Sequence, residues 1–225
     1  MLIIFDCDGV LVDTEPASNR CFAAALNQLG LDWTVEQTMA RLVGRSMKSC
    51  LEIVERELGR KVPGDFVAQL QQHTFDSFRR DGVRATPGIV GALDALDAAR
   101  IPYCVASSGE VEKMRLTLGL SGLLPRFERH LFSATMVPRG KPFPDLFLYA
   151  AAQMGFAPAD CPAHCIVVED AVPGITAARS AGMRALAYAA APHADRAGLA
   201  ASGGELFDDM ARLPALLDLA SALQS

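Results

Sequence analysis

Four short, fully apolar segments recur along the chain, and helix-like segments separate them. They are Leu2–Phe5, Tyr103–Ala106, Ile166–Val168 and Ala185–Tyr188, each bounded by polar residues, glycine or proline. A strand that is apolar throughout, instead of alternating with polar residues, is typical of a sheet buried on both faces. The pattern therefore predicts an α/β fold in which a doubly wound parallel sheet is covered by helices on each side.

The strand pattern stops between Asp13 and about Arg84. Segments 16–29, 47–58 and 66–78 carry apolar residues at helical spacing instead. We therefore expect two domains, an α/β core of residues 1–13 and 85–225 and an all-helical insert of residues 14–84. In the core, helices are expected over 89–100, 111–118 and 173–181, a loop with some helix over 187–204, and a last helix from Asp208-Asp209 to about Leu223.

Charge and hydropathy exclude several classes of function. The 21 basic and 26 acidic residues give a formal net charge of −5, so we expect no nucleic-acid partner. No apolar run approaches the roughly 18 residues of a membrane helix, and the N-terminus lacks the basic flank of a signal peptide. We therefore expect a cytoplasmic protein, without membrane contact, whose six cysteines are reduced.

Acidic residues follow two of the expected strands. Asp6 and Asp8 come directly after the first strand, and Glu169-Asp170 follow the third. If these strands are neighbours, four carboxylates converge at the sheet edge where doubly wound proteins bind ligands, and oxygen ligands of this kind favour Mg²⁺. Each pair alone is also compatible with a strand cap or, for Asp170, with capping of the following helix.

Two further segments suit a phosphate. Ser107-Ser108-Gly109 ends another strand, where hydroxyl and backbone N–H groups can bind phosphate oxygens. Lys141 lies between Gly140 and Pro142 in a proline-rich segment that ends at Asp145, and such a fixed cation can neutralise phosphate and carboxylates. An ordinary turn is the alternative for both. The cysteines and histidine of 161–165 supply only three ligands where a structural zinc needs four.

Together the four segments resemble the motifs of the haloacid dehalogenase superfamily of Mg²⁺-dependent phosphotransferases. The matching positions are the DxDGxxxD run from Asp6 to Asp13, Ser107, Lys141 in the GKPxPD setting, and Glu169-Asp170 with Gly174. The branch most similar to this chain contains phosphoglycolate phosphatases, sugar phosphatases and β-phosphoglucomutases of subfamily I. The resemblance implies a Rossmann-like core with a helical cap domain at residues 14–84.

The resemblance also implies roles for individual residues. Asp6 would be the nucleophile, Asp8 the general acid and base, and Lys141 a catalytic cation. Mg²⁺ would be held by Asp6, by the backbone carbonyl of Asp8 and by Asp170. Glu169 would be either a fourth ligand or a neighbour of the ligands that does not touch the metal. Phosphate would be bound by Ser107, Ser108, Gly109 and Lys141.

The resemblance thus implies a Mg²⁺-dependent phosphatase that hydrolyses a small phosphorylated metabolite through an aspartyl-phosphate. Glu15, Gly44, Arg45 and Lys48 are the candidates in the cap for contacting the substrate, whereas Arg79-Arg80 are expected at the solvated surface. A monomer is expected, with a dimer left open.

Other functions of the same fold are weighed against the phosphatase. A β-phosphoglucomutase-like sugar phosphomutase is the main alternative, but Ser18 and Met47 stand where such mutases carry His and Arg. A dehalogenase would not need Asp8 or the Glu169-Asp170 pair. A binding module without activity would be expected to lack one of the core residues.

Overall fold

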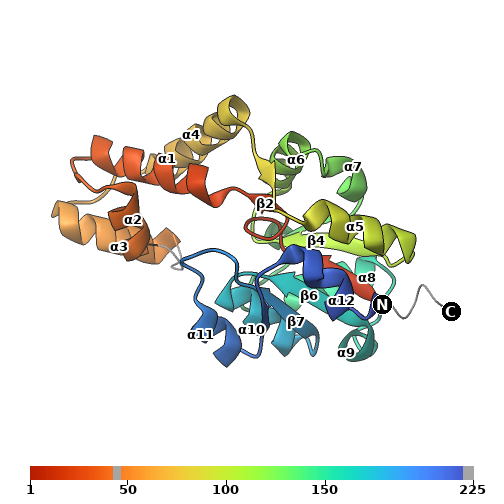
Figure 1. Ribbon diagram of the computed structural model, residues 1–225. Helices are drawn as coiled ribbons and strands as arrows, with labels where there is room; N and C mark the ends of the chain where they lie inside the picture. Colours follow the sequence, from red (N-terminus) through yellow and green to blue (C-terminus); the bar gives the residue numbers. More distant parts are fainter. Residues whose placement is uncertain (43–46, 220–225) are drawn as a thin grey trace. The chain divides into compact units, whose positions relative to one another are not determined.

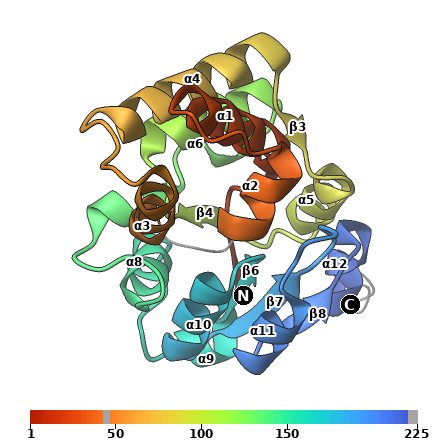
Figure 2. The same ribbon diagram turned by 90° about the vertical axis from the view of Figure 1, so that its left-hand side faces the viewer.

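The computed structural model describes residues 1–42 and 47–219 and separates into two compact units. One unit comprises Met1–Asp13 with Arg84–Ser225, and the other comprises Thr14–Val83. Figures 1 and 2 show the helices and strands of both units from two directions. No helix of the described residues has the length and hydrophobicity needed to cross a bilayer.

A six-stranded parallel sheet forms the centre of the larger unit. Its strands are β1 (Leu2–Phe5), β4 (Tyr103–Ser107), β5 (Leu131–Ser133), β6 (Cys165–Glu169), β7 (Arg184–Tyr188) and β8 (Glu205–Phe207), in the order β5-β4-β1-β6-β7-β8. Strand β1 therefore lies between β4 and β6, with Phe5 in register with both Val105 and Val168. This sheet confirms the predicted doubly wound α/β fold.

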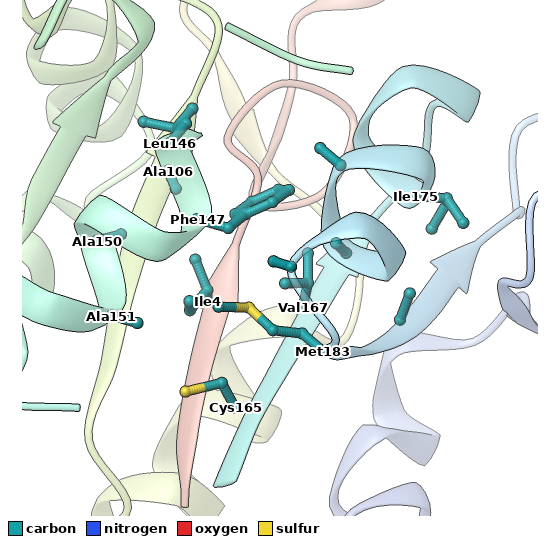
Figure 3. Close-up of a cluster of buried hydrophobic side chains, with 14 of the residues drawn as sticks. Ile4, Ala106, Leu146, Phe147, Ala150, Ala151, Cys165, Val167, Ile175 and Met183 are labelled. Carbon is teal, nitrogen blue, oxygen red and sulfur yellow. The ribbon is translucent and has the colours of Figure 1, made fainter. Parts of the chain in front are cut away.

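The alternation of side chains along β1 builds a core on each face of the sheet. Ile4 faces α8 (Asp145–Gln153) and α10 (Val172–Ser180) in the buried cluster of Figure 3, which also contains Phe147 and Met183. The next residue, Phe5, makes edge-on ring contacts with Tyr103 and Phe127. Because successive side chains point to opposite faces, the apolar side chains of β1 are buried in a hydrophobic core on each face of the sheet.

The remaining helices of this unit span ten residues or fewer. The helices are α5 (Ile89–Ala98), α6 (Val111–Leu120), α7 (Leu124–Phe127), α9 (Cys161–His164), α11 (Arg196–Ala201) and α12 (Leu213–Leu216), with 3-10 turns at Ala134–Met136 and Met210–Arg212. Strands β2 (Val12–Asp13) and β3 (Arg84–Ala85) pair antiparallel, at the two points where the chain leaves and re-enters this unit. The segment that leaves the larger unit and the segment that re-enters it are therefore hydrogen-bonded neighbours.

Within the described residues, which end at 219, the prediction of one long last helix is wrong, and its expected end at about Leu223 lies outside them. Asp209 does cap a helical start, because its carboxylate accepts from the backbone N–H of Ala211, but that start is a 3-10 turn. Helix α12 then ends at Leu216, and Asp218 adopts a left-handed backbone with φ of 55°. A turn of this kind ends an α-helix, since left-handed residues cannot continue it.

The smaller unit contains four helices, α1 (Glu15–Gln28), α2 (Val35–Leu42), α3 (Met47–Leu58) and α4 (Phe66–Asp81). Their apolar faces bury Leu26, Val54 and Leu70 in one cluster with Trp33 from the connection between α1 and α2. The three helices expected from apolar spacing are present, whereas α2 was not predicted.

Candidate active site

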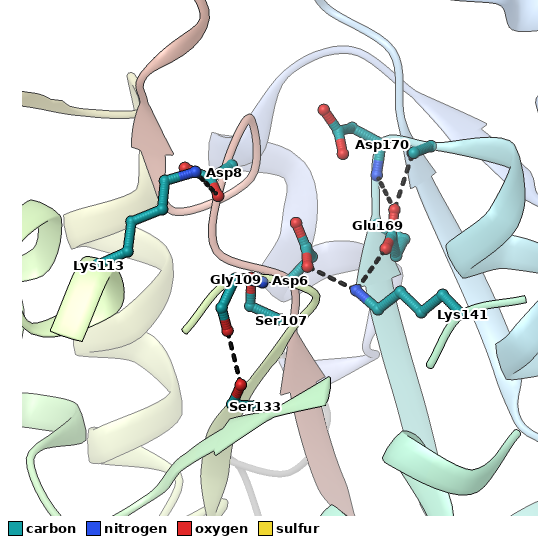
Figure 4. A network of polar contacts seen from close by, with 10 residues as sticks. Asp6, Asp8, Ser107, Gly109, Lys113, Ser133, Lys141, Glu169 and Asp170 are labelled. Carbon is teal, nitrogen blue, oxygen red and sulfur yellow. Dashed lines mark hydrogen bonds and ion pairs between the residues drawn. The ribbon is translucent and has the colours of Figure 1, made fainter. Parts of the chain in front are cut away.

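Three neighbouring strands end in polar residues at the same edge of the sheet, as expected from the sequence (Figure 4). Asp6 follows β1, Ser107 ends β4 and Glu169 ends β6. The backbone N–H of Asp6 still donates to the carbonyl of Val168 at 2.9 Å, so Asp6 is held in register with β6. The parallel sheet therefore brings residues from distant parts of the chain into one site.

Lys141 lies at the centre of this group. Its Nζ is 2.5 Å from Oδ1 of Asp6 and 2.7 Å from Oε1 of Glu169, and its side chain is only 5% exposed. The Arg139 guanidinium contacts both carboxylate oxygens of Asp145 across the Lys141 segment, at 2.9 to 3.2 Å. Lys141 is thus a fixed cation between two carboxylates, as the proline-rich segment predicted.

The buried ion pairs change the pKa values of both groups. Burial raises the pKa of Asp6 to about 7, and the negative charge of Glu169 adds to this effect, while Lys141 opposes it. Burial alone would lower the pKa of Lys141, but the two carboxylates more than offset it and raise that pKa. Lys141 therefore stays charged, whereas the protonation of Asp6 depends on what else occupies the site.

Glu169 has hydrogen-bond partners on both oxygens. Oε1 accepts from Lys141, and Oε2 accepts from the backbone N–H groups of Asp170 and Ala171 at 2.8 and 2.7 Å. These N–H groups precede α10, where negative charge is favourable. Glu169 therefore ties Lys141 to the start of α10.

One group of three carboxylates in the described part of the chain could hold a metal ion. Ligand atoms of Asp6, Glu169 and Asp170 all lie within 4.8 Å of one another. The turn after β1 leaves room for Asp170, because a Cβ at Gly9 would lie 2.0 Å from its Oδ2. An all-oxygen donor set fits Mg²⁺.

The side chain of Asp8 points to a different partner. Its Oδ2 accepts from Nζ of Lys113 at 2.7 Å, and Lys113 lies on α6, which follows β4. Burial would lower the pKa of Lys113, but Asp8 more than offsets this and raises it. Lys113 was not predictable as a site residue, because nothing in the spacing of α6 marks it. Only the order of β1 and β4 in the sheet brings it to Asp8.

The hydroxyl and glycine after β4 form a compact turn. Ser107 is buried and its Oγ accepts from the N–H of Gly109 at 3.1 Å, while Ser108 is exposed. Ser133 at the end of β5 donates to the Gly109 carbonyl at 2.8 Å. Ser133 was not predicted either, although it follows two apolar residues in the same way that Ser107 closes an apolar strand.

All six cysteines are free thiols. Cys7, between the two aspartates, is buried with Sγ 4.0 Å from Oγ1 of Thr117 on α6.

The candidate substrate contacts lie in the smaller unit. Glu15 starts α1 and Lys48 is exposed on α3. Gly44 and Arg45 lie outside the described residues. Arg79 and Arg80 are exposed and pair with Asp76 and Asp81.

Comparison with known proteins identifies the family. The model of the haloacid dehalogenase-like hydrolases matches residues 1–182. The chain belongs to this family. It is 31% identical over 195 residues to the 6-phosphogluconate phosphatase of Escherichia coli K12, covering 85% of this chain and 83% of that protein. It is also 31% identical over 185 residues to hexitol phosphatase A of the same organism, covering 82% and 81%.

A solved structure of the same family has the same fold as this chain. A HAD family hydrolase from Deinococcus radiodurans, with bound phosphate and sodium, superimposes with a TM-score of 0.80 at 30% identity, covering 98% of this chain and 96% of that one. The resemblance to the sugar-phosphatase branch is therefore confirmed. This haloacid dehalogenase-like hydrolase is a phosphoric monoester hydrolase.

Proposed function

We propose that this hydrolase is a Mg²⁺-dependent phosphatase of sugar phosphates or similar small phosphorylated metabolites, and that Asp6 is its nucleophile. The observation that carries the proposal is the Asp6 carboxylate, buried between Lys141 and the acidic pair Glu169-Asp170. The relatives support the substrate class, since they are named as phosphatases of a sugar acid and of hexitols.

The charges of the site support a divalent ion. Figure 4 draws four carboxylates and two lysines; Lys113 contacts Asp8, Lys141 contacts Asp6 and Glu169, and Asp170 is the fourth carboxylate. A divalent ion would balance the remaining negative charge, so that a phosphate would no longer meet a net negative site. Asp6, Asp170 and the backbone carbonyl of Asp8 would hold Mg²⁺. Glu169, whose oxygens already have partners, would act mainly by holding Lys141.

The first half of the reaction transfers the phosphoryl group to the protein. An oxygen of Asp6 attacks phosphorus, the bond from phosphorus to the sugar oxygen breaks, and Asp8 donates its proton to that oxygen. Lys141, Ser107, Ser108 and the turn at Gly109 bind the phosphoryl oxygens as negative charge develops on them. Mg²⁺, when bound, supplies further positive charge that lowers the repulsion between Asp6 and the phosphate.

The second half restores the enzyme. The Asp8 carboxylate takes a proton from water, whose oxygen attacks phosphorus while the bond from phosphorus to Asp6 breaks. Inorganic phosphate leaves, and Asp6 and Asp8 return to their starting states. We infer that residues 14–84 form the cap that selects the leaving group, with Glu15, Gly44, Arg45 and Lys48 as its candidate contacts.

We favour hydrolysis over phosphoryl transfer between two positions of a sugar. A mutase must retain and turn a bisphosphate, which requires additional cationic and acid–base groups in the cap. Ser18 on α1 and Met47 at the start of α3 can supply neither.

The direct test measures phosphate release from a panel of substrates, with and without Mg²⁺. The panel contains 6-phosphogluconate, a hexitol phosphate, fructose 1-phosphate, phosphoglycolate and β-glucose 1-phosphate with catalytic glucose 1,6-bisphosphate. We expect Mg²⁺-dependent release of phosphate and, for Asp6→Asn, a kcat at least about 100-fold lower, which corresponds to roughly 2.7 kcal/mol.

Two results would contradict the proposal. Asp6→Asn with near wild-type turnover would show that another group is the nucleophile. Glucose 6-phosphate that accumulates faster than inorganic phosphate would show that the enzyme is a mutase.

A further inference from the structure

Lys113 connects two parts of the site that lie far apart in the sequence. Its Nζ is 2.7 Å from Oδ2 of Asp8, 105 positions away. The side chains of Lys113 and Asp8 are 27% and 29% exposed, so the pair is partly shielded from solvent. Helix α6 supplies the lysine and the turn after β1 supplies the aspartate. The pair therefore joins the Asp6 segment to the element that follows Ser107.

The surroundings of Gly109 show where this pair lies. A Cβ at Gly109 would be 3.5 Å from Cδ of Lys113, 3.5 Å from Oγ of Ser107 and 3.9 Å from Oδ2 of Asp8. The alkyl chain of Lys113, the Ser107 hydroxyl and the Asp8 carboxylate thus surround one point (Figure 4). Lys113 lies within the site, beside a group that we propose binds phosphate.

The backbone of Asp8 is held by its own turn. Gly9 donates to the carbonyl of Val12 at 2.8 Å, and Leu11 and Val12 both donate to the carbonyl of Cys7. These bonds fix the path of the chain but leave the rotation of the Asp8 side chain to its side-chain contacts. A charge-assisted bond to a helix-anchored lysine restricts that rotation.

The two lysines divide the two aspartates between them. Lys141 contacts Asp6 and Glu169, while Lys113 contacts Asp8. We propose that Lys113 is a positioning residue that holds the Asp8 side chain in line for proton transfer at the leaving group. This inference rests on the proposed function, in which Asp8 gives its proton to the sugar oxygen. In this proposal Lys113 acts through Asp8, whose Oδ2 it contacts, and not on the substrate itself.

The dependence on the leaving group distinguishes this role from a merely structural ion pair. A sugar oxygen leaves poorly unless it is protonated, whereas 4-nitrophenolate leaves as a stable anion. Loss of Asp8 alignment should therefore lower kcat/KM, which reports the steps up to release of the leaving group, selectively for sugar phosphates. A general loss of folding or of phosphate binding would harm both substrates equally.

The experiment compares kcat/KM for 6-phosphogluconate, or the sugar phosphate of the panel that is hydrolysed fastest, with kcat/KM for 4-nitrophenyl phosphate. For Lys113→Met we expect a decrease of about tenfold or more on the sugar phosphate and less than about threefold on 4-nitrophenyl phosphate. Lys113→Arg should recover the sugar-phosphate activity to within about threefold, because it keeps a cation near Asp8. Arg115→Met, which removes an exposed cation of the same helix, is the matched control and should change neither.

Equal losses on the two substrates, or no loss, would overturn the inference. If Lys113→Met unfolds, the same two kcat/KM values are compared for Lys113→Gln and Lys113→Arg. Their melting temperatures show whether these variants fold. Asp6→Asn separates the two proposals. An active Asp6→Asn refutes the proposed function, whereas an inactive one combined with equal losses for Lys113→Met refutes only the role of Lys113.

Discussion

At the scale of single residues, the site depends on close approaches that leave no space for extra atoms. Gly9 has φ of 80° and stands against the Asp170 carboxylate. Both features require glycine, because other residues rarely adopt this backbone and any side chain would displace Asp170. The glycine of the DxDG segment thus serves the acidic pair on another strand as well as its own turn.

We predict that Gly9→Ala weakens Mg²⁺ binding. The added methyl group must displace the Asp170 carboxylate, so the Mg²⁺ concentration for half-maximal activity should rise about tenfold or more, which corresponds to roughly 1.4 kcal/mol. Gly122→Ala is the matched control, since Gly122 has φ of 77° but no atom within 4 Å of an added Cβ. It should cost about 1–2 kcal/mol of stability through backbone strain and leave the Mg²⁺ dependence unchanged. Similar Mg²⁺ dependence in the two variants would contradict this prediction.

At the scale of elements, long apolar patterns were predictable and short elements were not. Strands β1, β4, β6 and β7 lie where apolar runs predicted them, and helices α1, α3 and α4 where helical spacing did. Strands β5 and β8 span three residues each, too few for a pattern to stand out. Helix α2 had an overlooked signal, since Thr34 and Gln37 form reciprocal capping bonds of the T-x-x-Q type.

The same limit applied to the candidate site. Asp6, Ser107, Lys141 and the Glu169-Asp170 pair could be placed together from the sequence, because they follow strands or lie in a distinctive segment. Lys113 could not be placed there, because the sequence does not show which way the side chain of a helical lysine points. Its partner is decided by which strands are neighbours, and that follows only from the assembled sheet.

At the scale of the whole molecule, the raised pKa of Asp6 makes the stability of the metal-free protein depend on pH. The folded protein holds Asp6 at a pKa of about 7, above the ordinary value of 3.8. Between these pH values the unfolded chain has lost the proton that the folded protein retains. The contribution of Asp6 to the free energy of unfolding is therefore fully present below about pH 3.8 and decreases as the pH rises towards 7.

We predict that Asp6→Asn stabilises the metal-free protein, and increasingly so as the pH rises. With EDTA present, the excess stability of the variant should grow from pH 5 to pH 8 by about 1 kcal/mol or more, measured by urea unfolding. Mg²⁺ should reverse the order, because it binds the ionised Asp6 of the wild type. A difference between the two proteins that is constant with pH would show that burial of Asp6 does not have this effect.

In the proposed reaction Asp6 carries the phosphoryl group during turnover. The most direct measurement is acid quenching of Asp8→Asn during turnover of 4-nitrophenyl phosphate with Mg²⁺, followed by mass spectrometry of the N-terminal peptide. Asp8→Asn should form the aspartyl-phosphate with this leaving group but hydrolyse it slowly, because the variant lacks the base that activates water. The account predicts one phosphoryl group on Asp6. A phosphoryl group on Ser107 or another residue, or none on the protein, would contradict it.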